Sequence, residues 1–299
     1  MTVRILHCSD VHVTLDYSKI PLLKLGWRRW IALGELRLRG RQVAYAKAGD
    51  SIRQIVRDFR TLGADHLIVS GDLTAYALPG EFEGAKAALG DLAEDPLRCT
   101  VIPGNHDVYT PGAYRDRRFE TTFAPLLKSD LPEFAREGIW PLVRLLGEDV
   151  AIVGLKSARV PAVPGMSFGV IGKRQLGGLR DAANDPRLKE RAMVVVVHHA
   201  PLNQKGKRDK AYHALADKDA LFRVARGPRF AVLHGHIHRR YHHAATETRP
   251  HLFGAGSSTQ RGREGYWVIE VERGRIVGGR MLGLGLGPGE MAAPGAVGA

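Results

Sequence analysis

Seven side chains that are able to bind metal ions follow directly on short apolar runs of the sequence. They offer carboxylate, carboxamide and imidazole groups without any thiolate, a set that suits Mn²⁺, Fe or Zn²⁺ better than soft ions. One open catalytic site needs fewer than seven ligands, whereas two ions that share a carboxylate would use them all. The candidates are Asp10, His12, Asp72, Asn105, His198, His236 and His238.

Two pairs of these candidates, Asp10 with His12 and His236 with His238, are separated by a single residue. In extended backbone this spacing puts both side chains on one face, so we predict that each pair reaches a common metal centre. A bridged pair of ions about 3.5–4 Å apart would polarise a phosphoryl oxygen and hold a hydroxide in line for attack at phosphorus.

Each motif taken singly is weak evidence for a metal site. An Asp-x-His occurs by chance in many loops, and residues 104–107 (Gly-Asn-His-Asp) also suit a turn, because Asn, Gly and Asp favour one. The histidine-rich stretch 234–243 also suits a solvated basic patch. Chance does not explain the ordered set, with every member at the end of an apolar run.

Those apolar runs predict the elements that position the candidates. Short aliphatic runs that end in polar, glycine-rich turns are typical of buried strands, and helical patterns at 44–62 and 81–92 separate the first three. This alternation predicts an α/β fold, and from about Pro141 onward strands dominate and form a second sheet packed on the first. Ligands of open α/β sheets lie at the carboxyl ends of strands, where all the candidates fall. The predicted strands are 3–8, 66–69, 100–102, 151–155, 193–197, 230–233, 266–271 and 275–281.

The motifs, in this order, resemble those of the calcineurin-like metallophosphoesterase superfamily over roughly residues 3–282. The resemblance implies a four-layer α-β-β-α sandwich of two mixed sheets flanked by helices, in a single domain over 1–282. It also implies a binuclear metal-dependent phosphoesterase that uses a metal-bridging hydroxide to cut a phosphodiester or pyrophosphate bond. The matching blocks are Asp10-Val11-His12, Gly71-Asp72-Leu73, Gly104-Asn105-His106-Asp107, His198-His199-Ala200-Pro201 and Gly235-His236-Ile237-His238.

The resemblance implies a role for each matching residue. Two divalent ions are expected, with Mn²⁺ first and Fe or Zn²⁺ as alternatives. His106 would stabilise the transition state or protonate the leaving oxygen, and Asp107 would orient its imidazole. The ligands would be Asp10, His12 and His238 for one ion, Asn105, His198 and His236 for the other, and Asp72 as the bridge.

One block departs from the family pattern. The family usually has His-His-Pro-Pro where this chain has His-His-Ala-Pro, so His199 is a second choice for the ligand after His198. His234 lies inside a predicted strand, and we expect it to pack rather than to bind metal.

Two segments bear on the substrate. Residues 154–179 resemble a stretch of the cyclic-nucleotide phosphodiesterase branch, and the turn Gly256-Ser257-Ser258 is also typical there and is expected to face substrate. The same branch includes UDP-2,3-diacylglucosamine pyrophosphohydrolases, which cut a sugar-lipid pyrophosphate at a membrane surface. Residues 20–41 carry Trp27 and Trp30 on an apolar face beside arginines, which suits an interfacial helix and equally a helix packed on the domain.

We therefore predict a nucleotide or UDP-2,3-diacylglucosamine substrate, with a 3′,5′-cyclic nucleotide as the alternative. A nucleic-acid phosphodiesterase would suit the formal charge of +13. It is disfavoured, though not excluded, because the sequence has no basic platform interleaved with aromatic residues. A catalytically inactive interaction module is disfavoured because none of the family's metal ligands is missing.

The composition predicts the size of the core, the state of the cysteines and the location of the protein. The 299 residues are 44% hydrophobic, enough for a sizeable core. Cys8 and Cys99 lie in apolar stretches, which predicts buried thiols in a reducing compartment rather than a disulfide. No apolar run approaches the roughly 20 residues of a membrane span, and a strand is predicted soon after Met1. We predict a cytoplasmic protein, attached at most peripherally to the inner membrane face through 20–41, with a disordered tail at 283–299.

Overall fold

Five strands form the first of two mixed sheets in the computed structural model, which describes residues 2–20, 41–161, 163 and 166–284. The strands are β1 (Thr2–Cys8), β2 (His66–Val69), β3 (Cys99–Val101), β10 (Tyr266–Glu272) and β11 (Arg275–Leu282). Their order is β11-β10-β1-β2-β3, with β1, β2 and β3 parallel and β10 antiparallel to both of its neighbours.

The second sheet has six strands, which are β4 (Leu142–Leu146), β5 (Val150–Leu155), β6 (Ala192–Val197), β7 (Phe230–His234), β8 (Arg240–His243) and β9 (His251–Ala255). Their order is β4-β5-β6-β7-β9-β8. β5, β6, β7 and β9 are parallel, and β4 and β8 are antiparallel strands at the two edges. The parallel strands of each sheet therefore bring their carboxyl ends to one edge.

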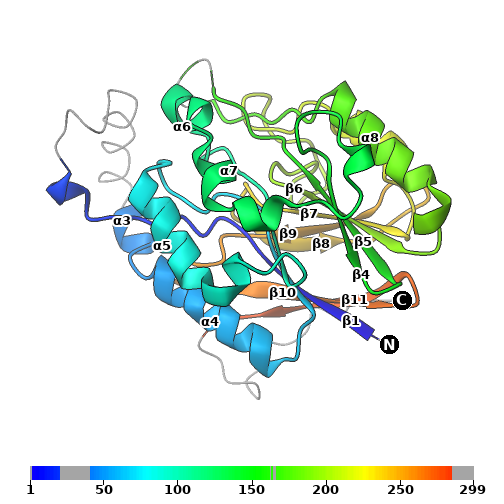
Figure 1. The fold of residues 1–299 in the computed structure, drawn as a ribbon, viewed down its shortest axis with the longest axis horizontal. Helices are drawn as coiled ribbons and strands as arrows, with labels where there is room; N and C mark the ends of the chain where they lie inside the picture. The colour runs from blue at the N-terminus through cyan, green and yellow to red at the C-terminus, as the bar shows by residue number, and fades with distance from the viewer. Residues whose placement is uncertain (1, 21–40, 162, 164–165, 285–299) are drawn as a thin grey trace.

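Helices cover the outer faces of both sheets, which confirms the predicted four-layer arrangement (Figure 1). The α-helices are α3 (Arg41–Ala44), α4 (Ala48–Thr61), α5 (Pro79–Leu89), α6 (Pro111–Arg115), α7 (Arg118–Thr122), α8 (Lys173–Asn184) and α9 (Lys218–Val224). The 3₁₀-helices are Tyr17–Lys19, Gly90–Ala93, Ala124–Leu127, Pro132–Phe134 and Pro186–Leu188. Helices α4 and α5 pack with the first sheet, and α8 and α9 with the second.

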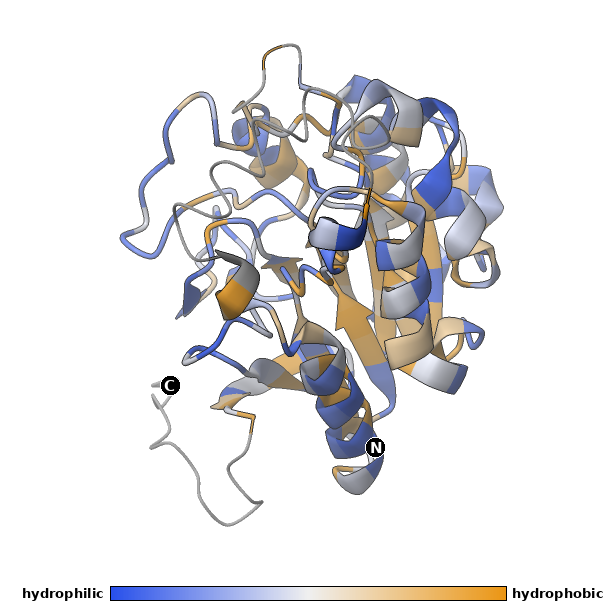
Figure 2. Cartoon of the chain, turned by 90° about the vertical axis from the view of Figure 1, so that its left-hand side faces the viewer, coloured by the Kyte–Doolittle hydropathy of each residue, from blue (hydrophilic) through white to orange (hydrophobic). Residues whose placement is uncertain are grey.

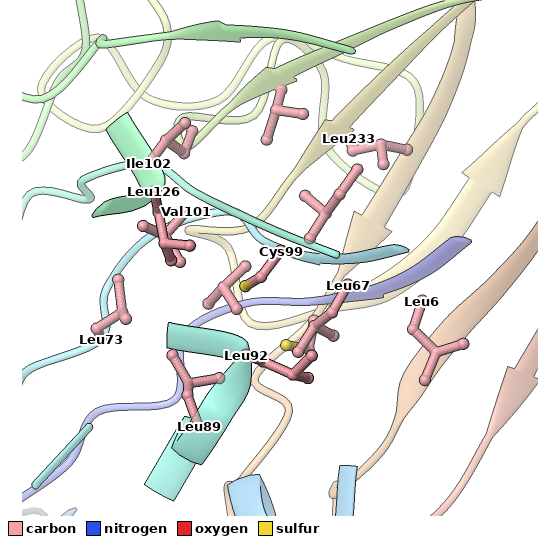
Figure 3. Packing of buried hydrophobic residues seen from close by; sticks show 14 of the residues in the cluster. Leu6, Leu67, Leu73, Leu89, Leu92, Cys99, Val101, Ile102, Leu126 and Leu233 are labelled. Atoms are coloured by element: carbon pink, nitrogen blue, oxygen red, sulfur yellow. The ribbon is translucent and has the colours of Figure 1, made fainter. Parts of the chain in front are cut away.

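Alternating side chains of the second sheet enter two different cores, as expected for strands. Val194 and Val196 of β6 join the core shared with the first sheet, to which Leu6, Leu67 and Leu233 also belong (Figure 3). Their neighbours in β6 pack against α8 and α9 instead. Figure 2 shows the same division, with hydrophobic strands inside and hydrophilic positions on the helices outside.

The second half of the chain holds more helix than we predicted. Strands dominate after Pro141, as predicted, but α8 and α9, which were not predicted, connect β5 to β6 and β6 to β7. Gly177 and Gly178 have low helix propensity, and α8 was therefore not predicted from the sequence. A Cβ atom at Gly178 would lie 2.2 Å from the Phe134 carbonyl oxygen, so close packing requires this glycine.

Other predictions on composition can be compared with the structure. Cys8 and Cys99 are buried free thiols, as predicted. No helix among the described residues is long and apolar enough to cross a membrane. The predicted amphipathic segment 20–41 lies outside the described residues except for its two ends, and so does the predicted disordered tail apart from 283 and 284.

Candidate metal centre

The seven predicted metal ligands lie in loops that follow β1, β2, β3, β6 and β7 at adjoining edges of the two sheets. Five of them have left-handed backbone, with φ of 51° at Asp10, 45° at His12, 54° at Asp72, 73° at His236 and 50° at His238. The backbone at the Asp10/His12 and His236/His238 pairs is therefore not extended, contrary to our prediction. The chain turns sharply after each strand, and such strained conformations cluster at functional sites.

Asp10, His12 and His238 form the first group of the centre. His238 Nε2 lies 3.2 Å from Asp10 Oδ1 and 3.2 Å from His12 Nε2. His12 Nδ1 lies 3.4 Å from the Thr74 carbonyl oxygen, which accepts its proton and leaves a lone pair on Nε2. Asp10 and His12 are buried, so water does not screen this cluster.

A chain of hydrogen bonds fixes the tautomer of His238. The Ser257 hydroxyl donates to the Asp10 carbonyl oxygen at 2.8 Å, so its 3.0 Å contact with Tyr45 must be donated by the Tyr45 hydroxyl. Tyr45 Oη has then used its proton and accepts from His238 Nδ1, 3.3 Å away. Neutral His238 therefore carries its proton on Nδ1 and presents the lone pair of Nε2 to Asp10 and His12.

Asp72, Asn105 and His198 form the second group. His198 Nδ1 donates to the Ser70 carbonyl oxygen at 2.9 Å, and its Nε2 lies 3.1 Å from Asn105 Oδ1 and 3.4 Å from Asp72 Oδ2. Asp72 Oδ2 is also 3.9 Å from His12 Nε2, which places this carboxylate between the two groups.

His236 completes the set from the second sheet. Its Nε2 donates to the His213 carbonyl oxygen at 2.9 Å, which leaves a lone pair on Nδ1. Its backbone N–H donates to Asp10 Oδ2 at 2.9 Å and so links the two sheets. The His236 ring also lies 5.2 Å from the ring of His198, measured between centroids.

The donor set fits divalent cations. Asp10 Oδ1 is buried and accepts no hydrogen bond from the described residues, because the nearest nitrogen, His238 Nε2, presents a lone pair. Burial lowers the pKa of His198, but the Asp72 and Asp10 carboxylates outweigh burial and raise that pKa to about 9. Both facts show that the facing acceptors require positive charge, which a metal ion supplies. Three triads with ligand atoms within 4.8 Å of one another lie here, namely Asp10–His12–His238, His12–Asp72–His106 and Asp10–Asp72–His198.

Two glycines allow the loops of the centre to approach one another. A Cβ atom at Gly104 would lie 2.1 Å from Asp72 Oδ1 and 2.4 Å from the Asp72 backbone nitrogen. At Gly235 it would lie 2.1 Å from Asp10 Oδ2 and 2.0 Å from Ser9 Oγ. The glycines of the G-N-H-D and G-H-x-H blocks therefore serve close packing of the loops.

His106 lies at the rim of the centre, with its ring 4.8 Å from the ring of His12 and stacked on Tyr109 at 5.9 Å. Its Nδ1 donates to the Ala75 carbonyl oxygen at 2.6 Å, so this carbonyl orients the imidazole. The prediction that Asp107 orients His106 was wrong. Asp107 is buried and accepts hydrogen bonds from the backbone of Leu73, Thr74 and Gly104 and from the Thr74 hydroxyl.

The carboxylate of Asp107 thus joins the loop after β2 to the loop after β3. Burial and the nearby Asp72 raise the pKa of Asp107 to about 7, against the three hydrogen bonds from Gly104 and Thr74 that lower it. This side chain positions the loops that carry Asp72 and Asn105, a role that its place beside His106 in the sequence does not reveal.

The two other histidines of the motifs lie behind the ligand positions. His199 Nδ1 is 2.8 Å from the Ser157 hydroxyl, whereas His198 Nε2 faces Asp72 and Asn105. His234 is buried at the end of β7, where its Nε2 lies 3.3 Å from the Tyr241 hydroxyl. This is a packing position, as expected for His234.

The turn at Gly256-Ser257-Ser258 was expected to face substrate, and that expectation was wrong. Ser257, Ser258 and Thr259 are buried. Ser258 Oγ accepts from the Ser9 backbone at 3.1 Å, and Thr259 Oγ1 donates to the Val11 carbonyl oxygen at 2.6 Å. The turn therefore holds the loop of Asp10 and His12 in place. This role and that of Tyr45 were not predicted from the sequence, because no motif contains Tyr45 and none marks the turn as a support.

Comparison with known proteins identifies the family. Residues 3–240 match the calcineurin-like phosphoesterase family. No curated protein sequence matches the chain significantly. A dimetal phosphatase from Danio rerio has a similar structure, with a TM-score of 0.61, 11% identity and coverage of 94% of this chain and 98% of that one.

Two further structures are similar in fold but longer. A purple acid phosphatase from yellow lupin (Lupinus luteus) seeds gives a TM-score of 0.55 at 10% identity, covering 95% of this chain and 54% of that one. A sulfate thiohydrolase from Thermus thermophilus gives 0.50 at 15% identity, covering 93% and 56%. The chain spans about half the length of these two proteins. At such identities the likeness shows the fold alone, but the family match covers most of the sequence, so the chain belongs to the calcineurin-like phosphoesterases, hydrolases that act on phosphoester bonds.

Proposed function

We propose that the chain is a two-metal hydrolase that cuts a phosphodiester or pyrophosphate bond of a nucleotide or a UDP-sugar lipid. One observation carries the two-metal part of this proposal: two groups of buried acceptor atoms face one another with the Asp72 carboxylate between them. Asp10, His12 and His238 would hold one ion. Asn105, His198 and His236 would hold the other, and Asp72 would serve both. Mn²⁺ is the ion we expect first, because the donors are oxygen and imidazole nitrogen.

When bound, a pair of divalent cations withdraws charge from the phosphoryl oxygens and lowers the pKa of the attacking water. The protein's own contribution begins with orientation, because every candidate ligand histidine has its second ring nitrogen held by a protein acceptor. His106 stands beside His12 and would give a proton to the leaving oxygen, with its Nδ1 kept on the Ala75 carbonyl.

The test compares metal content and turnover in matched variants. Asp72→Asn should lose both ions and hydrolyse bis(p-nitrophenyl) phosphate at a small fraction of the wild-type rate, because the shared charge is gone. Asp65→Asn is the control, since Asp65 is exposed and precedes β2 at the opposite end of the same strand. An Asp72→Asn protein with both ions and full turnover would contradict the assignment.

A second variant separates His106 from the ligands. His106→Ala should keep both ions and lower kcat by about a hundredfold or more, because a positioned acid is lost while the ligands stay. Metal content by elemental analysis and kcat with Mn²⁺ are measured on the same preparation. Loss of one ion in His106→Ala would show that His106 is a ligand and that the ligand set is wrong.

A further inference from the structure

An open pocket of about 500 Å³ adjoins the metal centre. One wall is formed by residues 236–239, and the other by residues of the segment 203–213 that precedes α9. The pocket shares His236 and His238 with the metal centre, so a molecule bound at the centre would extend into it. We call it the basic pocket.

The lining of the basic pocket carries more positive than negative charge, with Lys210 and Arg239 against Asp209. Lys210 and Arg239 are exposed, and neither forms an ion pair with any of the described residues. The one carboxylate in the lining, Asp209, is engaged: its Oδ2 lies 2.8 Å from His213 Nδ1, and its Oδ1 accepts from the Lys210 backbone at 2.8 Å. The two cations therefore face the pocket with their charges available to a ligand.

Hydrogen bonds and a ring contact hold the segment 203–213, which forms one wall of the basic pocket. The Asn203 side chain accepts hydrogen bonds from the backbone of Lys205 and Lys207, and the Asn203 carbonyl accepts from His243 at 2.9 Å. At its other end, the His213 ring stacks on the ring of His236, with centroids 3.8 Å apart and an interplanar angle of 27°. The segment 203–213 is thus held at both ends, at His243 and at the candidate ligand His236, and Lys210 lies within it.

We propose that the basic pocket binds a second phosphoryl group of the substrate. A phosphate ester with one phosphorus atom places its charge at the metal centre and leaves Lys210 and Arg239 without an anion. A diphosphate carries a second charged group, which these cations bind by charge-assisted hydrogen bonds. The inference rests on the proposed function and narrows it: nucleoside diphosphate derivatives are preferred over cyclic nucleotides. The exposed ring of Tyr212 in the same lining adds a planar surface for the organic part.

The first experiment measures binding without catalysis. Metal-chelated protein is titrated calorimetrically with ADP and with adenosine. ADP should bind more tightly than adenosine, and the double variant Lys210→Gln/Arg239→Gln should weaken ADP binding by about tenfold or more. The control is Lys189→Gln/Arg226→Gln, which removes equal charge from two exposed residues that precede β6 and β7 at the far ends of these strands. Equal affinity for ADP and adenosine, or unchanged ADP affinity in the double variant, would overturn the proposal.

The second experiment uses the Mn²⁺-loaded enzyme, with AMP and ADP as inhibitors of bis(p-nitrophenyl) phosphate hydrolysis and Mn²⁺ in excess. ADP should inhibit about tenfold more strongly than AMP in the wild type and in the control, and this preference should disappear in the double variant. Equal inhibition by AMP and ADP in the wild type would refute the second phosphoryl site. An enzyme that hydrolyses no phosphodiester while the calorimetric result holds would refute the proposed function and leave the pocket in place.

Discussion

At the scale of single residues, each candidate ligand histidine has one ring nitrogen bound to a protein acceptor. The acceptors are the carbonyl oxygens of Thr74, Ser70 and His213 and the hydroxyl of Tyr45. These bonds decide which nitrogen faces the centre before any ion arrives. The protein thereby avoids the loss of conformational freedom that ordering four imidazoles on metal binding would cost.

Tyr45 is the one side chain among these acceptors, so it can be changed alone. Tyr45→Phe keeps the ring against His12 but removes the oxygen that holds His238 Nδ1. We expect the affinity for one of two Mn²⁺ ions to fall by about 10–100-fold, because partners of ligand histidines carry effects of that size. Two-site calorimetry measures both affinities, and ¹⁵N shifts of the metal-free protein should report a mixture of His238 tautomers.

Tyr266→Phe is the control for this variant, since the Tyr266 hydroxyl donates to Asp58 at 3.0 Å, in contact with α4 rather than with a candidate ligand. Wild-type affinity for both ions in Tyr45→Phe would show that the hydroxyl does not position His238.

The ligand positions could be predicted from sequence because each stands within a few residues of a strand end, in a motif with fixed spacing. Tyr45 and Ser257 could not, because they contact His238 and the Asp10 backbone, respectively, from places distant in the chain, and no local pattern marks them. Asp107 was misjudged for a related reason: adjacency to His106 suggested a contact, whereas the turn aims its carboxylate at the backbone of Leu73 and Thr74.

At the scale of elements, the loop after β3 lies against the loop after β2 without room for an added methyl group. Gly104→Ala should destabilise the protein by about 1–3 kcal/mol and reduce metal binding, because the new Cβ overlaps the Asp72 backbone nitrogen, which cannot rotate away. Urea unfolding of the metal-free protein gives the free energy.

Gly112→Ala in α6 is the comparison, since a Cβ atom there meets nothing within 4 Å. It should leave stability unchanged or raise it by up to about 1 kcal/mol, because alanine has the higher helix propensity. Equal effects of the two substitutions would contradict the packing argument.

Eight of the eleven described strands were predictable, because continuous aliphatic runs mostly form buried strands, whereas β4, β8 and β9 were missed. The backbone between strands was not predictable, because Asp10 and His12 adopt left-handed conformations that non-glycine residues seldom adopt. Tertiary contacts stabilise these unfavourable backbone conformations, here through hydrogen bonds from Ser257, Ser258 and Thr259 to the loop of Asp10 and His12. Residues 9–12 alone therefore do not indicate that the distant turn 257–259 supports them.

At the scale of the whole molecule, buried neutral histidines make stability depend on pH. Burial lowers the pKa of His7 and His66 to about 3, and of His234 and His242 to about 4. These values lie below the 6.5 of an unperturbed histidine, so the unfolded chain binds more protons between pH 6.5 and 3. The contribution of these four histidines to the free energy of unfolding should therefore be complete above pH 6.5 and fall as the solution is acidified through this range.

The contribution of His66 to this pH dependence can be tested alone, because His66 lies at the amino end of β2, away from the candidate ligands. Its ring is bound to the Leu97 carbonyl and the Thr100 hydroxyl. Between pH 7.5 and 5, His66→Gln should lose about 2 kcal/mol less stability than the wild type, since glutamine does not titrate. Urea unfolding of both metal-free proteins at the two pH values gives the difference. Parallel losses in the two proteins would show that His66 does not resist protonation in the folded state.

The pairing of β1 with β10 has a consequence for synthesis. β1 is made first, yet one of its neighbours in the sheet, Tyr266–Glu272, lies more than two hundred residues later in the chain. While the ribosome is translating the interval, one edge of the amino-terminal half-sheet has no strand beside it, and exposed edges recruit other strands. Nascent chains of this protein should accordingly depend on chaperones until the carboxyl-terminal hairpin emerges, and chains stalled before residue 266 should aggregate.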